Sequence, residues 1–560
     1  MRTLIAAAAL AALASPASAT DLLVTNVHGI DVDRSGKIRH FSGLLIGGDG
    51  KVKRQLHGEM LKLADTDVVD GGGRTVMPGL IDAHGHIMGL GDVVLTLDLT
   101  GTTSIADLQA RLKAYAAAHP DRPWIIGRGW NQESWNDKRF PTAADIDAVE
   151  IGRPVWLTRV DGHAAVANSA AMKRAQIGRS TKAPVGGEII DGLFVDIAQG
   201  LVESHIPEPT PAMLDQMLSE AQKAMVSVGL VSAADMGTSA PAWQAMRRAG
   251  EAGTLKVRIF SYAGAPENWR AINHGKPTDW LYGQRLKLVG TKIYTDGALG
   301  SRGAWLKLPY HDRPDTRGLQ FLKDDELLAQ VREVSSGGGQ LAAHAIGDAA
   351  NAQIITAYEK IAAEFGPGRR PRIEHFQIVD PKDIPRLKPA GIIASMQPTH
   401  QTSDRLMAEA RLGMERLPGA YAWQTVEKLG IPIAFGSDFP VESPNPFPGL
   451  MAAVSREDMK GDPKGGWIPS ERVNLAQAIE GFTRGAAYAG FAEGQLGCLD
   501  AGCAADFIVV DRDPTKVDPQ SLGATKVLET WIGGEKIYAA PLSPAAAPLP
   551  TLEPGPERGR

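Results

Sequence analysis

The chain has 560 residues, of which 43% are hydrophobic and 22% are charged, and its formal net charge is −5. A chain of this length is too long to fold around one ordinary hydrophobic core, so we expect two or three structural units. Both signs of charge are abundant, which excludes a nucleic-acid-binding footprint and a polybasic membrane patch and favours a small-molecule partner.

The first nineteen residues have the pattern of a secretory signal peptide. Arg2 precedes an apolar run from Leu4 to Leu13, and Ala17-Ser18-Ala19 is a small-residue cleavage motif. This run is too short to span a membrane, and no later stretch approaches about eighteen uninterrupted apolar residues. We therefore expect cleavage after Ala19 and a periplasmic or secreted protein without a membrane span.

Residues 20–75 are predicted to form a small β unit, because short apolar strands alternate there with turns and no helical period is visible. The apolar run that starts at Val76 leads into His84-Gly85-His86. Two histidines one residue apart point to the same side of a strand, which suits a metal such as zinc. Such a pair also occurs by chance on polar loops, so the later strands decide its meaning.

A long stretch, from about residue 90 to residue 225, separates this strand from the next predicted strand. It contains an amphipathic helix at 105–118, buried strands at 124–130 and 154–163, and a second amphipathic helix at 213–228. The glycine-rich stretch at 182–192 is predicted to be a loop.

From residue 229 onwards, short apolar runs alternate with helical segments, which indicates parallel βα units. The runs start near residues 229, 255, 286, 339, 371, 391 and 432. With the strand before His84 they make eight, so the sequence predicts an α/β fold, a (β/α)8 TIM barrel, with the 90–225 insertion covering its mouth. The alternative is an open doubly wound sheet, but no glycine-rich phosphate-binding motif follows the first strand.

The barrel unit is expected to span residues 76–490, after which the chain returns to short strands. We expect residues 491–540 to complete a composite β-sandwich with residues 20–75, since chain termini often meet. Residues 541–560 are rich in proline and alanine and are expected to be disordered. The two cysteines, Cys498 and Cys503, form either one local disulfide or two free thiols.

Polar side chains stand at the carboxyl ends of the predicted barrel strands, where barrel enzymes carry their chemistry. They are His84 and His86 on strand one, Lys292 on strand four, His344 on strand five, His375 on strand six and Asp438 on strand eight. Neutral imidazoles bind zinc, and a carboxylate beside the metal can act as general base toward water. Taken singly, His375 could be a buried structural histidine and Asp438 a turn cap. Their shared position at strand ends favours a metal site.

Lys292 has two open interpretations. Carbamylation by CO₂ would convert its amine into an anionic ligand that bridges two metals. Alternatively, the ammonium group pairs with Asp296 or with a carboxylate of the substrate, since a cation beside a metal needs a neutralising partner.

Together these residues resemble the amidohydrolase superfamily, and more narrowly amidohydrolase family 3, the YtcJ-like group that includes N-substituted formamide deformylases. Further motifs of that group are RVDGHAAVANSAA (159–171), KIYTDGALGSRGA (292–304) and GQLGCLDAGCAADFIVVDRDP (494–514). The likeness covers about residues 21–540 and implies a metal-dependent barrel with a composite β-sandwich.

The resemblance also implies roles for individual residues. It makes Asp438 the general base. The metal would be zinc, as one or two ions, and its ligands would be His84, His86, Lys292, His344, His375 and Asp438. Lys292 would be the carbamylated bridge between two ions. Residues predicted to face the substrate are His163, Trp130, Arg302 and Gln397, with Trp135 and His400 as further candidates for the pocket wall.

These features predict a secreted hydrolase that breaks a C–N bond, of an amide or formamide-like group, in a small molecule. An esterase, lactonase or phosphoesterase is an alternative, because the same activated water attacks those bonds and the fold does not set the substrate. A catalytically silent periplasmic binding protein is a further alternative, against which the complete set of ligands argues. The predicted fold and function are also compatible with a homodimer.

Overall fold

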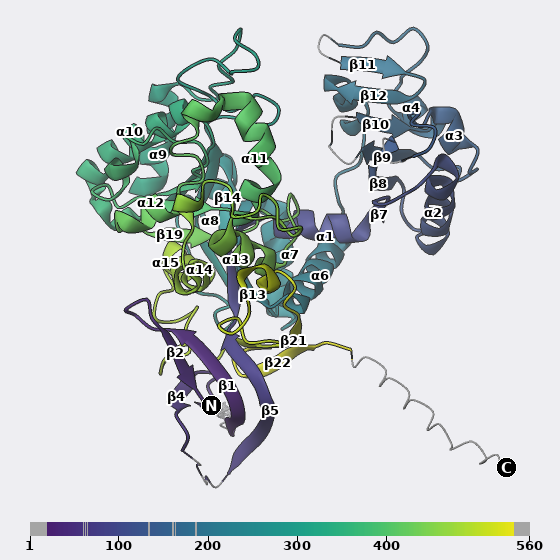
Figure 1. Ribbon diagram of the computed structural model, residues 1–560. Helices are drawn as coiled ribbons and strands as arrows, with labels where there is room; N and C mark the ends of the chain where they lie inside the picture. The colour runs from purple at the N-terminus through teal and green to yellow at the C-terminus, as the bar shows by residue number, and fades with distance from the viewer. Residues whose placement is uncertain are drawn as a thin grey trace, which may run out of the picture.

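The computed structural model describes residues 20–541 except 60, 62, 64, 133, 134, 160, 161, 163, 185 and 186 (Figure 1). The expected signal peptide and residues 542–560 of the expected tail lie outside the described residues. Within the described part of the chain the strands form three sheets, and no helix there is long and apolar enough to cross a membrane.

Eight parallel strands form the central sheet. They are β6 (Leu80–Gly85), β13 (Leu230–Thr238), β14 (Arg258–Gly264), β15 (Leu286–Tyr294), β16 (Gln340–Ala345), β17 (Arg372–His375), β18 (Ile393–Met396) and β19 (Ile433–Phe435). Each strand pairs in parallel with the next one in this order. The two ends of the sheet also meet, because the Asp438 amide donates to the His84 carbonyl at 2.7 Å and Gly85 bridges Phe439. The predicted (β/α)8 barrel is therefore confirmed.

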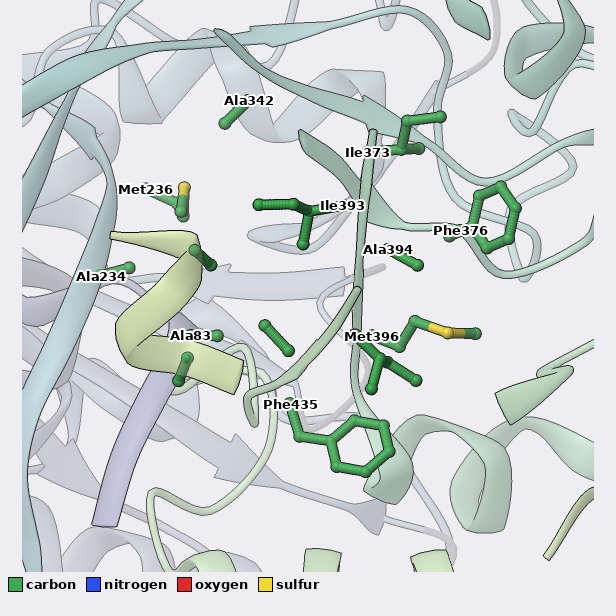
Figure 2. Close-up of a cluster of buried hydrophobic side chains, with 14 of the residues drawn as sticks. Ala83, Ala234, Met236, Ala342, Ile373, Phe376, Ile393, Ala394, Met396 and Phe435 are labelled. Atoms are coloured by element: carbon green, nitrogen blue, oxygen red, sulfur yellow. The ribbon is translucent and has the colours of Figure 1, made fainter. Parts of the chain in front are cut away.

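The barrel strands are buried on both faces, which explains why they appear in the sequence as continuous apolar runs rather than alternating ones. All six residues of β16, for example, are buried. Figure 2 shows side chains from several barrel strands, including Ala83, Met236, Ile373 and Ile393, in one buried cluster.

Helices alternate with the barrel strands and surround them (Figure 1). They are α1 (Ile87–Leu95), α6 (Pro211–Ser227), α7 (Ala240–Glu251), α8 (Ala265–Asn273), α9 (Asp324–Ser336), α10 (Asp348–Phe365), α11 (Pro398–Leu412), α12 (Trp423–Lys428), α13 (Pro446–Ser455), α14 (Leu475–Gly481) and α15 (Arg484–Ala489). Several begin at a side-chain cap followed by proline. Thr210 and Ser239, for instance, accept hydrogen bonds from the third amide of α6 and α7 and so satisfy a free helix donor.

The insertion after the first barrel strand has its own sheet, in the order β11-β12-β10-β9-β8-β7. Its strands are β7 (Leu97–Asp98), β8 (Ile125–Trp130), β9 (Val155–Arg159), β10 (Ala164–Ala167), β11 (Gly187–Ile190) and β12 (Leu193–Asp196), and its helices are α2 (Ile105–Ala118), α3 (Ala143–Asp147), α4 (Ser169–Arg174) and α5 (Gly200–Glu203). The inserted unit is smaller than the expected 90–225 range, because α6 packs against α1 beside the barrel.

Two expectations for the insertion are wrong. Figure 1 shows its sheet standing to one side of the barrel, joined to it through α1 and α6, rather than covering the mouth. The stretch predicted as a loop contains β11 and the turn of the β11–β12 hairpin, in which Ile190 pairs with Leu193. Asp191 and Gly192 have φ angles of 48° and 86°. Positive φ at both residues is what the two-residue hairpin turn requires, and Asp-Gly is one of its preferred sequences.

Strands from both ends of the chain form the third sheet. They are β1 (Asp21–Val32), β2 (Ile38–Phe41), β3 (Gly43–Ile46), β4 (Val52–Leu56), β5 (Thr66–Pro78), β20 (Phe507–Val510), β21 (Val527–Ile532) and β22 (Glu535–Ala539); a short helix, α16 (Pro519–Leu522), lies between β20 and β21. The antiparallel β5–β20 pair joins the two ends, and Val76 and Phe507 share one buried cluster. This arrangement confirms the composite β-sandwich.

The two cysteines of the sequence are joined. Cys498 and Cys503 form a disulfide in the segment that leads into β20, which decides between the two alternatives left open by the sequence.

Candidate metal centre

The six residues predicted at the strand ends lie together at one end of the barrel. They line a cavity of about 390 Å³, within the usual range for small-molecule sites. Parallel strands bring their carboxyl ends to one rim, which is why residues up to 354 positions apart in sequence meet there. None of the described residues between 97 and 210 lines this cavity.

Asp438 is the centre of the cluster. Its Oδ1 atom lies 3.0 Å from His86 Nε2 and 3.4 Å from His84 Nε2. Its Oδ2 atom lies 3.7 Å from His400 Nε2, and Lys292 Nζ lies 3.2 Å from His84 Nε2. One carboxylate therefore faces three imidazoles, two from the end of β6 and one from α11.

Two histidines are held in a defined orientation by acceptors outside the cluster. His84 Nδ1 lies 2.6 Å from Glu374 Oε2, and His375 Nδ1 lies 2.9 Å from Gln397 Oε1. Both partners are acceptors, so in each ring Nδ1 carries the proton and Nε2 keeps its lone pair. This is the arrangement that metal-binding histidines use, in which a second hydrogen bond fixes the ring and its tautomer.

Several buried atoms in the cluster make no hydrogen bond within the described part of the chain. They include His344 Nε2, His400 Nε2 and Asp438 Oδ1. Buried polar atoms are nearly always satisfied, and imidazole nitrogens with a carboxylate oxygen are the donors that zinc prefers. The residues present therefore fit a divalent metal. Donor atoms lie within 4.8 Å of one another in two groups that share Asp438, namely His84-His86-Asp438 and His375-His400-Asp438.

Burial keeps three of the histidines, His84, His344 and His375, neutral. It lowers the pKa of His84 to about 4 and that of His344 to about 3, with the nearby Lys292 charge adding to the effect, and it lowers the pKa of His375 well below its usual range. Neutral imidazole is the form that binds metal.

The carboxylate at the centre stays ionised. Burial by itself opposes the charge on Asp438, but the imidazoles that face it, His84 foremost and His86 through a direct contact, hold its pKa well below the usual range. Asp438 also has a φ angle of 61°, in the left-handed region that is strained for a residue with a side chain. Such strain persists where the surroundings fix the backbone, and it is concentrated at functional sites.

Lys292 is buried at 1% exposure between His84 and the ring of Tyr294, whose centroid lies 4.9 Å from Nζ. The alternative pairing of Lys292 with Asp296 is wrong. The Asp296 carboxylate instead accepts hydrogen bonds at 2.8–3.0 Å from the backbone amides of Trp305, Ile346 and Gly347. Burial lowers the pKa of Lys292 to about 8.

A buried charge network behind the centre was missed by the sequence analysis. Arg372 donates to both oxygens of Glu374, at 2.7 and 3.0 Å, and also to the Ala83 carbonyl at 2.6 Å. Arg372 lies at 1% exposure and Glu374 at 0%. Against the effect of burial, the guanidinium holds the pKa of Glu374 down to about 2, so a full carboxylate faces His84. The available signal was the position of Glu374 directly before a predicted ligand.

The predicted substrate residues fall in four different places. Trp130 and Trp135 belong to the core of the inserted unit, where their indoles donate to the carbonyls of Leu157 and Thr102, both at 2.8 Å. Their assignment to the pocket is wrong, because a small unit with its own core needs large aromatic side chains to fill it.

The other candidates are distributed as follows. Arg302 pairs with Asp312 at 2.8 Å and does not line the cavity, so its predicted contact with substrate is wrong as well. Gln397 lies behind His375 and holds that ring rather than the substrate. His400 does line the cavity. His163 lies outside the described residues.

Comparison with known proteins places this geometry in context. Residues 67–538 match the model of a family described as the amidohydrolase family. The chain is 32% identical over 508 residues to the putative amidohydrolase YtcJ of Bacillus subtilis strain 168, covering 88% of this chain and 94% of the relative. It is 25% identical over 504 residues to the N-substituted formamide deformylase of Arthrobacter pascens, covering 85% of this chain and 90% of the relative. Among solved structures, an uncharacterized metal-dependent hydrolase from Pyrococcus horikoshii OT3 superposes with a TM-score of 0.77 at 28% identity, covering 89% of this chain and 99% of that one.

Proposed function

Because the chain belongs to the amidohydrolase family, we propose that it is a metal-dependent hydrolase that breaks a C–N bond, of an amide or formamide-like group, in a small molecule. The observation that carries the proposal is the set of buried nitrogen and oxygen atoms around Asp438 that make no hydrogen bond with any described residue. A relative named as an N-substituted formamide deformylase supports the choice of bond.

The proposed ligands are the residues that converge at the rim, namely His84, His86, His344, His375 and Asp438, with Lys292 beside them. Zinc, as one or two ions, suits these donors. Once bound, zinc polarises a carbonyl and lowers the pKa of water towards about 7. Glu374 and Gln397 orient the rings of His84 and His375 by accepting a hydrogen bond from the Nδ1 atom of each ring, which leaves Nε2 for the metal.

Asp438 is the proposed proton carrier. Its ionised carboxylate lies in the cavity at 7% exposure and accepts a proton from the attacking water. It then delivers this proton to the nitrogen of the breaking C–N bond, which leaves as a neutral amine. General acid–base catalysis of this kind contributes about 10²–10⁴-fold to the rate.

We further propose that Lys292 carries a carbamate. Its neutral amine adds to CO₂, which forms one N–C bond and releases one proton. The lowered pKa of the buried amine supports this step, because more of it is neutral near pH 8 than in an exposed lysine. The product is an anion among the imidazoles, and it removes the repulsion between an ammonium group and a metal.

The proposal is tested with the purified protein, whose metal content is measured, on a panel of N-substituted formamides, amides, esters and lactones. Asp438→Asn is expected to lower kcat at least about 100-fold on the working substrate. Glu409→Gln, a carboxylate-to-amide change outside the cavity, serves as the matched control. Full turnover by Asp438→Asn would show that the assigned role is wrong, and activity confined to esters or lactones would show that the proposed bond is wrong.

We also propose that residues 1–19 are removed on export to the periplasm or the medium. The Cys498–Cys503 disulfide supports this, since disulfides persist in oxidising compartments. Amino-terminal sequencing of the mature protein should then start at Thr20. A mature protein that retains Met1 contradicts the proposal.

A further inference from the structure

One face of helix α11 forms the wall of the cavity beside the metal centre. His400, Ser403, Asp404 and Met407 all line the cavity. These positions follow the i, i+3, i+4, i+7 spacing that places side chains on one side of a helix. Ser403 and Asp404 have no part in the proposed hydrolysis, so their chemistry points to recognition of the substrate.

Asp404 is held rigidly on this face. Its Oδ2 atom accepts hydrogen bonds from Gln377 Nε2 and from the Tyr421 hydroxyl, both at 3.1 Å. Gln377 Nε2 also donates to the Tyr421 hydroxyl at 2.5 Å, so the three side chains fix one another. Both donors approach the same oxygen, and Oδ1 accepts no hydrogen bond from any residue that the structure describes. A fixed carboxylate with one oxygen left over is a preorganised acceptor.

No lysine or arginine of the described chain neutralises Asp404. Among the described residues neither lysine nor arginine forms an ion pair with it, and the adjacent Arg405 pairs with Asp462 instead. Burial raises the pKa of Asp404, and His400 is the one positive influence on it among the residues that the structure describes. Asp404 is partly buried, and a carboxylate withdrawn from water without a cationic partner is costly unless a ligand supplies one.

The charge of the whole wall has one sign. Glu442 also lines the cavity and accepts a hydrogen bond from the Ser403 hydroxyl. Among the lining residues the only lysine or arginine is Lys292, which lies at the metal end against His84. The cavity therefore has the predicted metal centre at one end and the carboxylates of Asp404 and Glu442 along the wall. An anionic substituent would be repelled from this wall, whereas a cation would be attracted.

The rest of the lining includes several apolar side chains. Tyr294, Leu299, Ile346 and Met407 contribute side chains to it. A ligand that matches the cavity thus has a polar group at the metal centre, a short apolar body and a positive charge at the wall.

We propose that Asp404, assisted by Glu442, selects substrates that carry a protonated amine a short apolar distance from the bond that is broken. The proposal rests on the proposed function only in placing the scissile group at the metal centre. Asp404 then acts as a specificity-determining residue, because a substrate ammonium donates to its free Oδ1 atom while the metal centre holds the other end.

Two probes of nearly equal shape test the proposal. N-(para-aminomethylbenzyl)formamide carries an ammonium group at neutral pH, and N-(para-ethylbenzyl)formamide replaces that group by an apolar methyl. Affinity is measured by calorimetry on the metal-loaded protein, and hydrolysis is followed as formate release. The wild type is expected to bind the cationic probe at least about tenfold more tightly, the size of one charge-assisted hydrogen bond.

Asp404→Asn is expected to bring the ratio of the two affinities close to one, and Glu442→Gln to lower it by a smaller factor. Glu409→Gln on the same helix, outside the cavity, should keep the wild-type ratio; its carboxylate accepts a hydrogen bond from the indole of Trp467. Thermal unfolding and metal content of each variant show whether it is folded.

The outcomes separate this inference from the proposed function. Preferential binding of the cationic probe without hydrolysis of either probe supports the role of Asp404 and rejects the formamide bond. Equal affinity and equal hydrolysis of the two probes overturn the role of Asp404 and leave the proposed function in place. Failure of the wild type to bind the cationic probe also overturns the inference.

Discussion

The buried carboxylate of Glu374 offers the most specific test of how the metal centre is held. It accepts a hydrogen bond from His84 Nδ1 at 2.6 Å and forms two more with Arg372, and all three side chains are buried. Glu374→Gln keeps the size of the side chain and removes its charge. The amide then has one acceptor atom for two donors, so either His84 or Arg372 loses its partner.

Two magnitudes follow from this geometry. Loss of the hydrogen bond behind a metal-binding histidine lowers metal affinity by about 10–100-fold, which corresponds to about 1.4–2.7 kcal/mol. Separately, the Arg372 guanidinium stays buried without its full counter-charge, and breaking a buried ion pair in this way costs about 3–5 kcal/mol of folding free energy.

A second buried pair supplies a matched control. Arg258 and Asp506, at 4% and 3% side-chain exposure, form an equivalent two-point pair at 2.7 and 2.8 Å between the barrel and β20, and neither residue lines the cavity. Asp506→Asn should therefore lose a similar folding free energy and keep its affinity for zinc.

The assay has two readouts. Zinc affinity is measured by competition with a chelator, and the free energy of unfolding is measured by urea titration. The reasoning is refuted if Glu374→Gln binds zinc as tightly as the wild type, or if Asp506→Asn loses zinc affinity to the same degree.

Three further predictions concern single residues. Wild-type protein incubated with ¹³C-bicarbonate should show a carbamate carbon signal that Lys292→Met lacks, and no signal in the wild type rejects carbamylation. Burial raises the pKa of Glu427 from 4.5 to about 7, and the nearby charge of Glu480 adds to the effect. The protonated side chain therefore favours the folded state below about pH 4.5, and this contribution to stability is lost as the pH rises through 7. Glu427→Gln should then raise the melting temperature more at pH 8 than at pH 5, and an equal change at both pH values contradicts the assignment. Trp130→Ala should destabilise the inserted unit by about 3–5 kcal/mol and expose residues 97–210 to proteolysis without lowering zinc content; loss of zinc without increased cleavage would place Trp130 at the site after all.

The barrel could be predicted from the sequence because its physical pattern is local. A strand covered on both faces is apolar along its whole length, as in the run that ends at His344, and each of the eight predicted runs overlaps an observed barrel strand. The convergence of the strand-end residues then follows from topology alone, since parallel strands in a barrel end at one rim.

The residues that orient the centre could not be predicted in the same way. Glu374 acts across the barrel on His84, 290 positions away, and its charge is stable only because Arg372 lies beside it. Asp404 lies on a helix rather than at the carboxyl end of a barrel strand, so the position that predicts the histidines does not predict Asp404. Its spacing of four residues after His400 was the only local signal.

The insertion shows the limit of composition as a guide. Trp130 was assigned to the pocket because aromatic residues line small-molecule sites, but they also fill cores, and only the separate sheet β7–β12 decides between the two. The Asp191-Gly192 hairpin, by contrast, was visible in the sequence as a turn dipeptide between two short apolar segments and was overlooked within a glycine-rich stretch.

The central claim is that the histidines at the barrel rim and Asp438 hold a metal. Diffraction from crystals of the protein grown with zinc, recorded at the zinc absorption edge, tests it most directly. We predict one or two anomalous peaks at about 2.0–2.2 Å from the imidazoles of His84, His86, His344 and His375 and from Asp438, with additional density for a carbamate on Lys292 Nζ. No peak among these residues, or zinc bound only elsewhere on the chain, would contradict the assignment.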